Sequence, residues 1–153
     1  MKLSTSNARS ESVAKSFTFG GAWCRGQHCI IPVEAFYKPD WVTGKAIPTR
    51  LTRSDGQPMG IAGLWDTWNE PGKAPLLSFM MLAINAADHP LMRDYHWPND
   101  EKRMIVVLPE GRYQEWLEAP AEESVAFMQQ YPADRLVATP KLSTAKGETH
   151  QLI

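Results

Sequence analysis

Two strongly apolar segments and the polar stretch between them constrain the fold of this chain most. The segments "LLSFMMLAI" (76–84) and "MIVVL" (104–108) have the composition of strands that are buried on both faces. We therefore expect both strands to lie in the interior of a sheet. The polar segment "ADHPLMRDYHWPNDEKR" that joins them is long for a connection, and long connections often carry functional residues. The sequence thus predicts a sheet with two central strands and a functional loop between them.

The remaining patterns indicate short elements. "CIIP" is typical of a strand that ends at Pro32, and the residues 11–19 favour a short helix closed by Gly20 and Gly21. "AIPTRLTR" and "MGIAGLW" flank the turn sequence "SDGQP", which predicts a β-hairpin. Two short helical segments and a last strand follow. We expect one α+β domain over residues 1–153, β-rich, with mixed or antiparallel sheets and a few short helices.

Charge and cysteine content exclude several classes of function. The formal net charge is −1, so the chain has no overall positive field, and a nucleic-acid site has to be a local groove. The N-terminus has no apolar signal core and no segment is long enough to span a bilayer, which favours the cytoplasm and no membrane partner. The C-x4-C spacing of Cys24 and Cys29 fits no strong zinc signature, and no glycine-rich phosphate loop is present. We expect no metal and no cofactor.

His96 is the first candidate for chemistry. It lies in the long loop, next to Trp97, and a histidine with a pKa near neutral suits general acid–base catalysis. The alternative is a loop histidine whose ring nitrogens are satisfied by hydrogen bonds. No G-x-S-x-G motif supports a serine hydrolase. The residues alone therefore define an α+β domain with a candidate site centred on His96.

Four segments, in the same order along the chain, resemble motifs of the SOS-response-associated peptidase (SRAP) family. "SNARSES" (6–12) resembles its N-A-R-x-E-[ST] motif, and "HCIIPVEAFYKPDW" resembles its "RC-[LIV]-x-P-x-x-G-F-[YF]-E-W" segment. "IAGLW" is similar to the strand that follows. "SFMMLAINAADHPLMRDYHWPNDEKRMIVVL" is similar to the strand–loop–strand that carries an essential His before an Arg-Met pair.

The resemblance implies a β-rich α+β fold around a cleft and a role in the SOS response to DNA damage. It implies binding of single-stranded DNA at abasic sites, with Asn7 and Arg9 positioning the sugar and phosphate and His96 assisting proton transfer. The planar guanidinium of Arg9 is suited to a phosphate. Trp41 and Trp97 are the tryptophans that we expect to stack on exposed bases.

Two departures from the family pattern bear on catalysis. The family's nucleophile is a Cys directly after the initiator Met, whereas this chain has Lys2, and only a few residues precede Asn7. We therefore expect a truncated or degenerate member without the family's crosslinking and autopeptidase activity. The position of the family's catalytic Glu is occupied by Lys38, and Glu34 falls four residues earlier.

Three hypotheses remain open from the sequence. The first is a domain that presents Asn7, Arg9 and His96 in one groove and binds abasic sites without chemistry. The second is abasic-site processing through a Schiff base on Lys38, with Glu34 and His96 as further catalytic candidates. The third is a plain single-strand or protein-binding module, in which Lys38 is a phosphate contact or a surface residue. An exposed sheet edge would also favour a homodimer.

Overall fold

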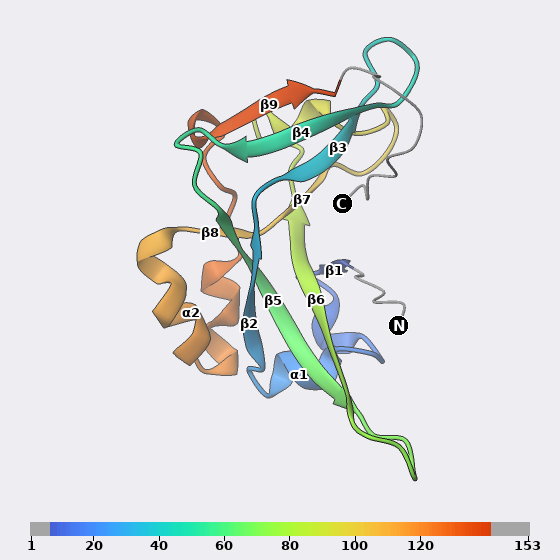
Figure 1. Ribbon diagram of the computed structural model, residues 1–153, viewed down its shortest axis with the longest axis vertical. Coiled ribbons are helices and arrows are strands. Elements are labelled where there is room, and N and C mark those ends of the chain that lie inside the picture. The colour runs from blue at the N-terminus through green and yellow to red at the C-terminus, as the bar shows by residue number, and fades with distance from the viewer. Residues whose placement is uncertain (1–6, 142–153) are drawn as a thin grey trace. The chain divides into compact units, whose positions relative to one another are not determined.

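The computed structural model describes residues 7–141, and its strands form two sheets (Figure 1). The chain divides into two compact units. Unit 1 comprises the described residues of the ranges 1–31, 60–84 and 105–129. Unit 2 comprises those of 32–59, 85–104 and 130–153. Each unit is described by itself below.

The larger sheet has the strand order β1-β6-β5-β2, with β7 paired to β6 and β8 paired to β5. Its strands are β1 (Asn7–Arg9), β2 (His28–Val33), β5 (Met59–Trp68), β6 (Leu76–Asn85), β7 (Arg103–Ile105) and β8 (Val107–Leu108). β1 is parallel to β6, whereas β5 is antiparallel to β6 and to β8. β6 thus has a neighbour on both edges, as its apolar sequence predicts. In Figure 1, β5 and β6 run side by side into the turn that joins them.

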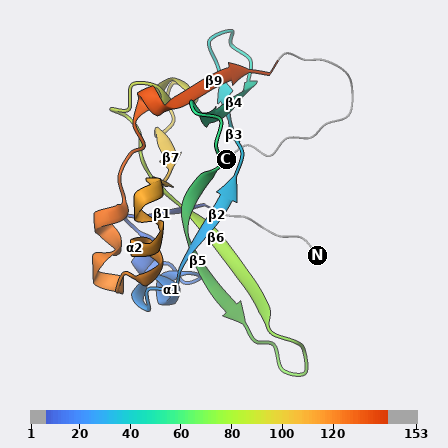
Figure 2. The ribbon, with the colours of Figure 1, turned by 60° about the vertical axis from the view of Figure 1, so that its left-hand side comes forward.

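Short helices cover one side of this sheet in unit 1. They are α1 (Gly20–Cys24), α2 (Tyr113–Glu118) and the 3-10 segments η1 (Val13–Lys15), η3 (Glu110–Arg112) and η4 (Ala121–Phe127). Figure 2 shows α2 beside β2 and β5, and the fully buried Trp116 of α2 donates an indole hydrogen bond to the Cys29 carbonyl of β2 at 2.9 Å. Burial of this one aromatic ring joins helix and sheet.

The smaller sheet belongs to unit 2. It consists of β3 (Phe36–Asp40), β4 (Ile47–Arg53) and β9 (Leu136–Pro140), all antiparallel, in the order β3-β4-β9. One face of β4 is buried, with Thr49, Leu51 and Arg53 all less than a tenth exposed. The 3-10 segments η2 (Met92–Asp94) and η5 (Ala133–Arg135) complete the elements of this unit.

The structure confirms the α+β class and corrects three local predictions. β4 and β5 both form, but they pair in different sheets, so the predicted hairpin is wrong. β2 continues through Pro32 to Val33. The predicted helix over residues 11–19 is only the short η1, and α1 begins at the two glycines. Gly20 permits this because a Cβ there would lie 2.8 Å from the Ala14 carbonyl oxygen.

Gly63 on β5 offers a sharp test of packing in unit 1. A Cβ at this position would lie 2.6 Å from the Met80 carbonyl oxygen and 3.1 Å from Cys29 Sγ, and would also collide with Ile31. We expect Gly63→Ala to lower the free energy of unfolding by about 1–3 kcal/mol, because the surrounding strands have to shift. Chemical denaturation measures this. Gly111→Ala is the control, because a Cβ at this position meets nothing within 4 Å, and its free energy of unfolding should not fall.

Candidate functional site

The predicted site residues divide between the two units. Asn7 and Arg9 belong to unit 1. The predicted residues in unit 2 are Glu34, Lys38, Trp41, His96 and Trp97. The grouping of Asn7 and Arg9 with His96 in one groove therefore stays a prediction.

Asn7 and Arg9 lie at the two ends of β1, and both are exposed, with the partly buried Ala8 between them. In an extended strand, alternate side chains point the same way. The register places Asn7 opposite Met81 and Arg9 opposite Ala83 of the parallel strand β6. Asn7 and Arg9 therefore point to the same side of this short strand.

Lys38 lies on the buried face of the smaller sheet. It follows Phe36 by two residues on β3, so both side chains point to the same face, and its cross-strand neighbour is Thr49. Phe36 and Thr49 are 0% and 1% exposed, and Lys38 itself is only 7% exposed. The alternative that Lys38 is a surface residue is therefore wrong. Alternate residues of a strand share one face, so Lys38 could be exposed only if Phe36 were exposed as well.

The charge that acts on Lys38 is the positive charge of Arg103. Among the described residues, no hydrogen bond or ion pair involves its ammonium group. Burial and, to a smaller extent, the positive charge of Arg103 together lower the pKa of Lys38 from 10.5 to about 8. Lysines are rarely buried in the absence of a counter-ion. Arg103 was only one of several charged loop residues in the sequence, and its importance follows from its electrostatic effect on Lys38.

His96 joins two parts of the long loop. Its Nε2 accepts a hydrogen bond from the Arg103 backbone N–H at 2.9 Å, so the proton of the neutral ring is on Nδ1. Nδ1 then donates to the Met92 carbonyl at 3.2 Å. Burial lowers the pKa of His96, and the charge of Lys38 lowers it further. A neutral His96 thus holds Arg103 in place beside Lys38, and proton transfer by its ring requires one of these backbone bonds to open.

His89, the other histidine of the loop, is part of the core of unit 2. It is 1% exposed, and its Nε2 lies 2.6 Å from the Tyr131 carbonyl. Its Nδ1 accepts the backbone N–H groups of Leu91 and Met92. The His89 ring therefore fixes the start of the loop. It also holds Met92 of η2, whose carbonyl accepts the hydrogen bond from His96.

Trp41 and Trp97 contact each other in unit 2. Their ring centroids are 4.5 Å apart and their planes are at 87°, an edge-to-face arrangement. Trp41 is partly buried, whereas Trp97 is 44% exposed. Trp97 thus presents a ring held by a neighbouring ring, the arrangement expected of a stacking platform. Glu34 is exposed in the bend between β2 and β3, and its predicted catalytic role stays a prediction.

His28, which lies between Cys24 and Cys29 in the sequence, belongs to a buried network in unit 1. Its ring stacks on Trp116 at a centroid distance of 3.8 Å. Nδ1 donates to the Trp116 carbonyl at 2.8 Å, and Nε2 accepts from the Ser124 hydroxyl at 2.6 Å. Both ring nitrogens are thereby occupied. Burial raises the pKa of the Cys29 thiol to about 11, which further disfavours the thiolate that a metal needs.

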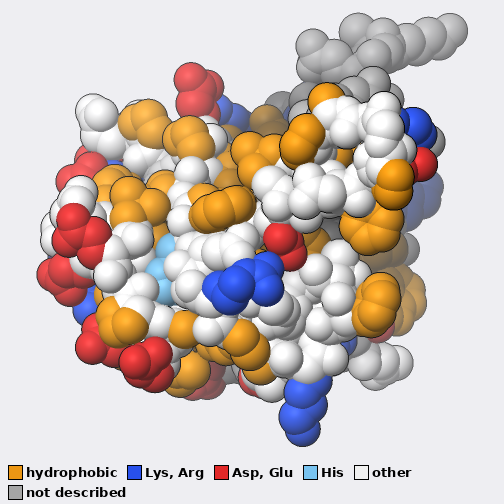
Figure 3. Space-filling model, turned by 90° about the horizontal axis from the view of Figure 1, so that it is seen from below, with side chains coloured by type: hydrophobic (Ala, Val, Ile, Leu, Met, Phe, Trp, Pro, Cys, Tyr) orange, Lys and Arg blue, Asp and Glu red, His pale blue; other side chains and the backbone are white. Residues whose placement is uncertain are grey.

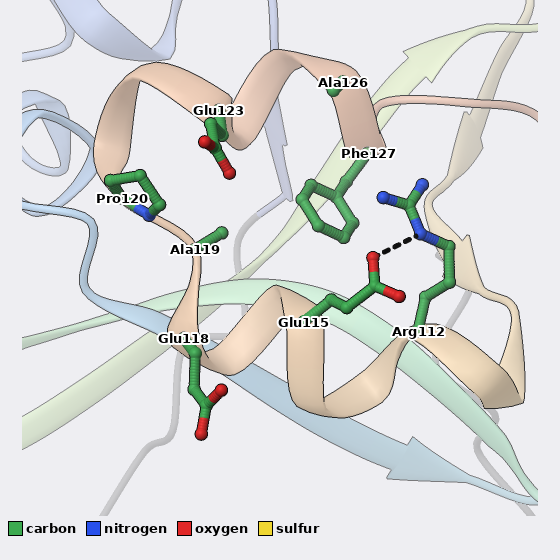
Figure 4. A pocket seen from close by; sticks show the side chains of 8 residues that line it. All are labelled: Arg112, Glu115, Glu118, Ala119, Pro120, Glu123, Ala126 and Phe127. Carbon is green, nitrogen blue, oxygen red and sulfur yellow. Dashed lines mark hydrogen bonds and ion pairs between the residues drawn. The ribbon is translucent and has the colours of Figure 1, made fainter.

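A pocket of about 300 Å³ on unit 1 has the wrong charge for DNA. It lies between α2 and η4, and Figure 4 shows Glu115, Glu118 and Glu123 around it. Arg112 is held by an ion pair to Glu115 at 3.1 Å and lies over the Phe127 ring. In Figure 3, acidic side chains gather at the left-hand edge, over α2 and η4. Carboxylates repel phosphate, so this part of unit 1 is unsuited to a nucleic acid.

The charge of Lys38 should be visible in the titration of His96. In Lys38→Gln, we expect the pKa of His96 to rise, because a positive charge that opposes protonation is removed. It should stay below its ordinary value of 6.5, because the ring remains partly buried. NMR titration of the imidazole signals measures both points. Lys45→Gln, at an exposed position in unit 2, is the matched control, and an equal shift there would contradict the interpretation.

The fold and these motifs define a class of protein, and comparison with known proteins identifies it. The family model described as "SOS response associated peptidase (SRAP)" matches residues 1–145. This chain belongs to the SRAP family.

Relatives of this family member are longer than the chain. It is 29% identical over 136 residues to the "Abasic site processing protein YoqW" of Bacillus subtilis (strain 168), a match that covers 86% of this chain and 57% of YoqW. YoqW of Bacillus phage SPbeta matches equally well. The chain thus spans less than two thirds of the length of these relatives.

Solved structures agree with the fold. A Bordetella bronchiseptica protein is 54% identical, with a TM-score of 0.86, over 90% of this chain and 65% of the other. A Bacteroides thetaiotaomicron protein has a TM-score of 0.75 at 18% identity, over 88% of this chain and 57% of the other, which supports the fold alone. None of the helices in residues 7–141 is long and apolar enough to cross a membrane.

Proposed function

We propose that this protein binds single-stranded DNA at abasic sites. The observation that carries the proposal is the cluster of unit 2, in which the buried Lys38 has no carboxylate bonded to it among the described residues and Trp97 presents a half-exposed ring. The partly buried Arg103 acts on Lys38 with its positive charge and is ion-paired to Glu101 at 3.3 Å. A relative within the same family is named for abasic site processing. Cations that are held in place attract phosphate, and an exposed indole ring stacks on bases.

Binding to single strands accounts for both parts of the cluster. With a net charge of −1, the chain has no general attraction for duplex DNA, so local contacts have to supply the affinity. A base can stack on Trp97 only where it is unpaired. Loss of a base leaves room for the sugar to approach the protein closely. Arg9 and Asn7, exposed on β1, are proposed to contact phosphate and sugar.

Fluorescence anisotropy with labelled oligonucleotides tests this function. We expect tighter binding to a single strand that carries a tetrahydrofuran abasic analogue than to the same strand with an intact base or to its duplex. Trp97→Ala should weaken binding about 5- to 150-fold, the range for one lost stacking contact of about 1–3 kcal/mol. Trp68→Ala removes an exposed tryptophan of unit 1 and should leave the affinity unchanged.

Salt dependence distinguishes the phosphate contacts. Arg9→Ala should weaken binding to all single strands alike and reduce the slope of log affinity against log salt by about one. Equal affinity for the intact and the abasic strand would instead support a plain single-strand-binding module. Absence of salt-sensitive binding to any of the strands would refute the proposal.

A further inference from the structure

We propose that Lys38 is the nucleophile of this site and captures a sugar aldehyde, the ring-opened form of an abasic site, as a Schiff base through its Nζ atom. The inference rests on the proposed function and adds a covalent step to it. Its basis is a lysine on the buried face of β3 with no bonded carboxylate among the described residues, in a protein whose family includes an abasic site processing protein.

The surroundings of Lys38 do not account for it as a structural residue. A buried ammonium group normally has a carboxylate partner, since an unpaired charge in the interior is strongly destabilising. Phe36 and Thr49 flank Lys38, and the charge that acts on it is that of the Arg103 guanidinium. The same arrangement is what an amine nucleophile requires, since burial and a neighbouring cation both favour its neutral form.

The neutral amine is present in useful amounts near pH 7. With a pKa of about 8, roughly a tenth of Lys38 is uncharged at pH 7, whereas an ordinary lysine is uncharged in well under a thousandth of molecules. His96 adds no second positive charge, because its own pKa is lowered and its ring is neutral. The backbone N–H of Arg103 is held by His96 and its guanidinium is ion-paired to Glu101 at 3.3 Å, and we propose that this guanidinium contacts a phosphate that flanks the captured sugar.

The small remaining exposure of Lys38 selects the substrate. Only 7% of the surface of Lys38 is accessible, so a bulky group is excluded from its surroundings. A sugar without a base is slender, and its ring-opened form carries an aldehyde at the carbon from which the base was lost. An intact nucleotide offers neither the aldehyde nor the space. The site is thereby suited to the abasic sugar of a flexible single strand.

The covalent step balances without a cofactor. The lone pair of neutral Nζ attacks the aldehyde carbon, and the carbonyl oxygen takes up a proton while the nitrogen loses one, which gives a carbinolamine. The hydroxyl group then leaves as water, and a carbon–nitrogen double bond replaces it. Solvent water moves the protons, because both ring nitrogens of His96 are engaged with the backbone. The reaction is reversible by hydrolysis, so the adduct is transient unless it is reduced.

Reductive trapping of the full chain tests the inference. The protein is mixed with a single strand that carries one natural abasic site, made by excising uracil, in the presence of cyanoborohydride. We expect one adduct whose mass is the sum of both partners less one water plus two hydrogens, and peptide mapping should place it on Lys38. The trapping rate should rise steeply with pH up to about 8 and then level off.

Variants and a second oligonucleotide separate the outcomes. Lys38→Arg keeps the charge and Lys38→Met keeps the length, and both should abolish the adduct, whereas Lys102→Arg in the same unit should retain it. Mapping on the native protein needs no variant, so an adduct on another amine overturns the inference even where a variant fails to fold. Binding to the tetrahydrofuran strand without any adduct to the aldehyde strand refutes the Schiff base alone and leaves Lys38 as a phosphate contact. Loss of binding to both strands refutes the proposed function as well.

Discussion

Lys38→Met is expected to raise the free energy of unfolding at pH 7 by about 1–3 kcal/mol. A pKa lowered from 10.5 to about 8 corresponds, at about 1.4 kcal/mol for each pKa unit, to about 3 kcal/mol by which the charged lysine destabilises the fold. Methionine has a similar length and no charge, so it fills the space between Phe36 and Thr49 without this cost. Urea unfolding followed by tryptophan fluorescence measures the difference.

The stability difference between Lys38→Met and the native protein should depend on pH. Because the folded pKa of Lys38 lies below the unfolded one, the lysine is charged in both states below pH 8 and the destabilisation is then complete. Between about pH 8 and 10.5 the unfolded chain binds more protons, so the native protein gains stability as the pH rises. The advantage of Lys38→Met should therefore be largest at pH 7 and vanish above pH 10.5.

An exposed lysine supplies the control for this experiment. Lys45 lies in unit 2 between β3 and β4 and is exposed. Lys45→Met should change stability by less than about 0.5 kcal/mol at every pH. If Lys38→Met were less stable than the native protein at pH 7, the ammonium group would have to be stabilised in the folded state. The account of an unpaired buried amine would then be wrong.

A residue that destabilises its own fold fits the interpretation of Lys38 as a functional group. The family pattern places a carboxylate at this position, and a carboxylate beside Arg103 would be an opposite charge rather than a like one. A lysine at this buried position is instead repelled by the Arg103 guanidinium, which would attract a carboxylate. Strained or destabilised groups occur preferentially at functional sites, where chemistry requires them. The gain in stability and the loss of trapping that we expect in Lys38→Met therefore have the same cause, the removal of the buried amine.

The sequence was informative where a pattern repeats over several residues. The continuous apolar segment of β6 predicts an interior strand, and the alternation along β4 and β5 predicts strands there. Alternation does not predict which strands pair, because pairing depends on contacts between residues that are far apart in the sequence. The predicted hairpin is wrong for this reason: β4 pairs with β3 and β9, whereas β5 pairs with β6 and β8.

The burial of Lys38 could have been inferred from its own strand. Phe36 and Lys38 are two residues apart, and a strand that buries one of them buries the other. The effect of Arg103 was beyond the reach of the sequence, since 65 residues separate it from Lys38 along the chain. A loop histidine is expected to form hydrogen bonds through its ring, yet only the structure shows that the Arg103 backbone N–H donates to the ring of His96.

Trp116→Ala is expected to lower the free energy of unfolding by about 3–5 kcal/mol, the range for truncating a large buried aromatic side chain. The Trp116 side chain is fully buried, stacks on His28 and lies edge-to-face with Phe127 at 5.3 Å. Its indole N–H donates to the Cys29 carbonyl, so the truncation also leaves a half-buried acceptor without its donor. Denaturant unfolding measures the loss, and circular dichroism shows whether the variant still folds.

The next residue on the same helix isolates the cause of this loss. Leu117 is 46% exposed, so Leu117→Ala should cost less than about 1 kcal/mol although it changes the same turn of α2. A variant that keeps the ring, Trp116→Phe, should recover much of the stability, because the stack on His28 is retained while the hydrogen bond to Cys29 is lost. If Leu117→Ala were as damaging as Trp116→Ala, the helix itself and not the buried ring would stabilise unit 1. Equal stability of Trp116→Phe and Trp116→Ala would assign the effect to the single hydrogen bond rather than to aromatic packing.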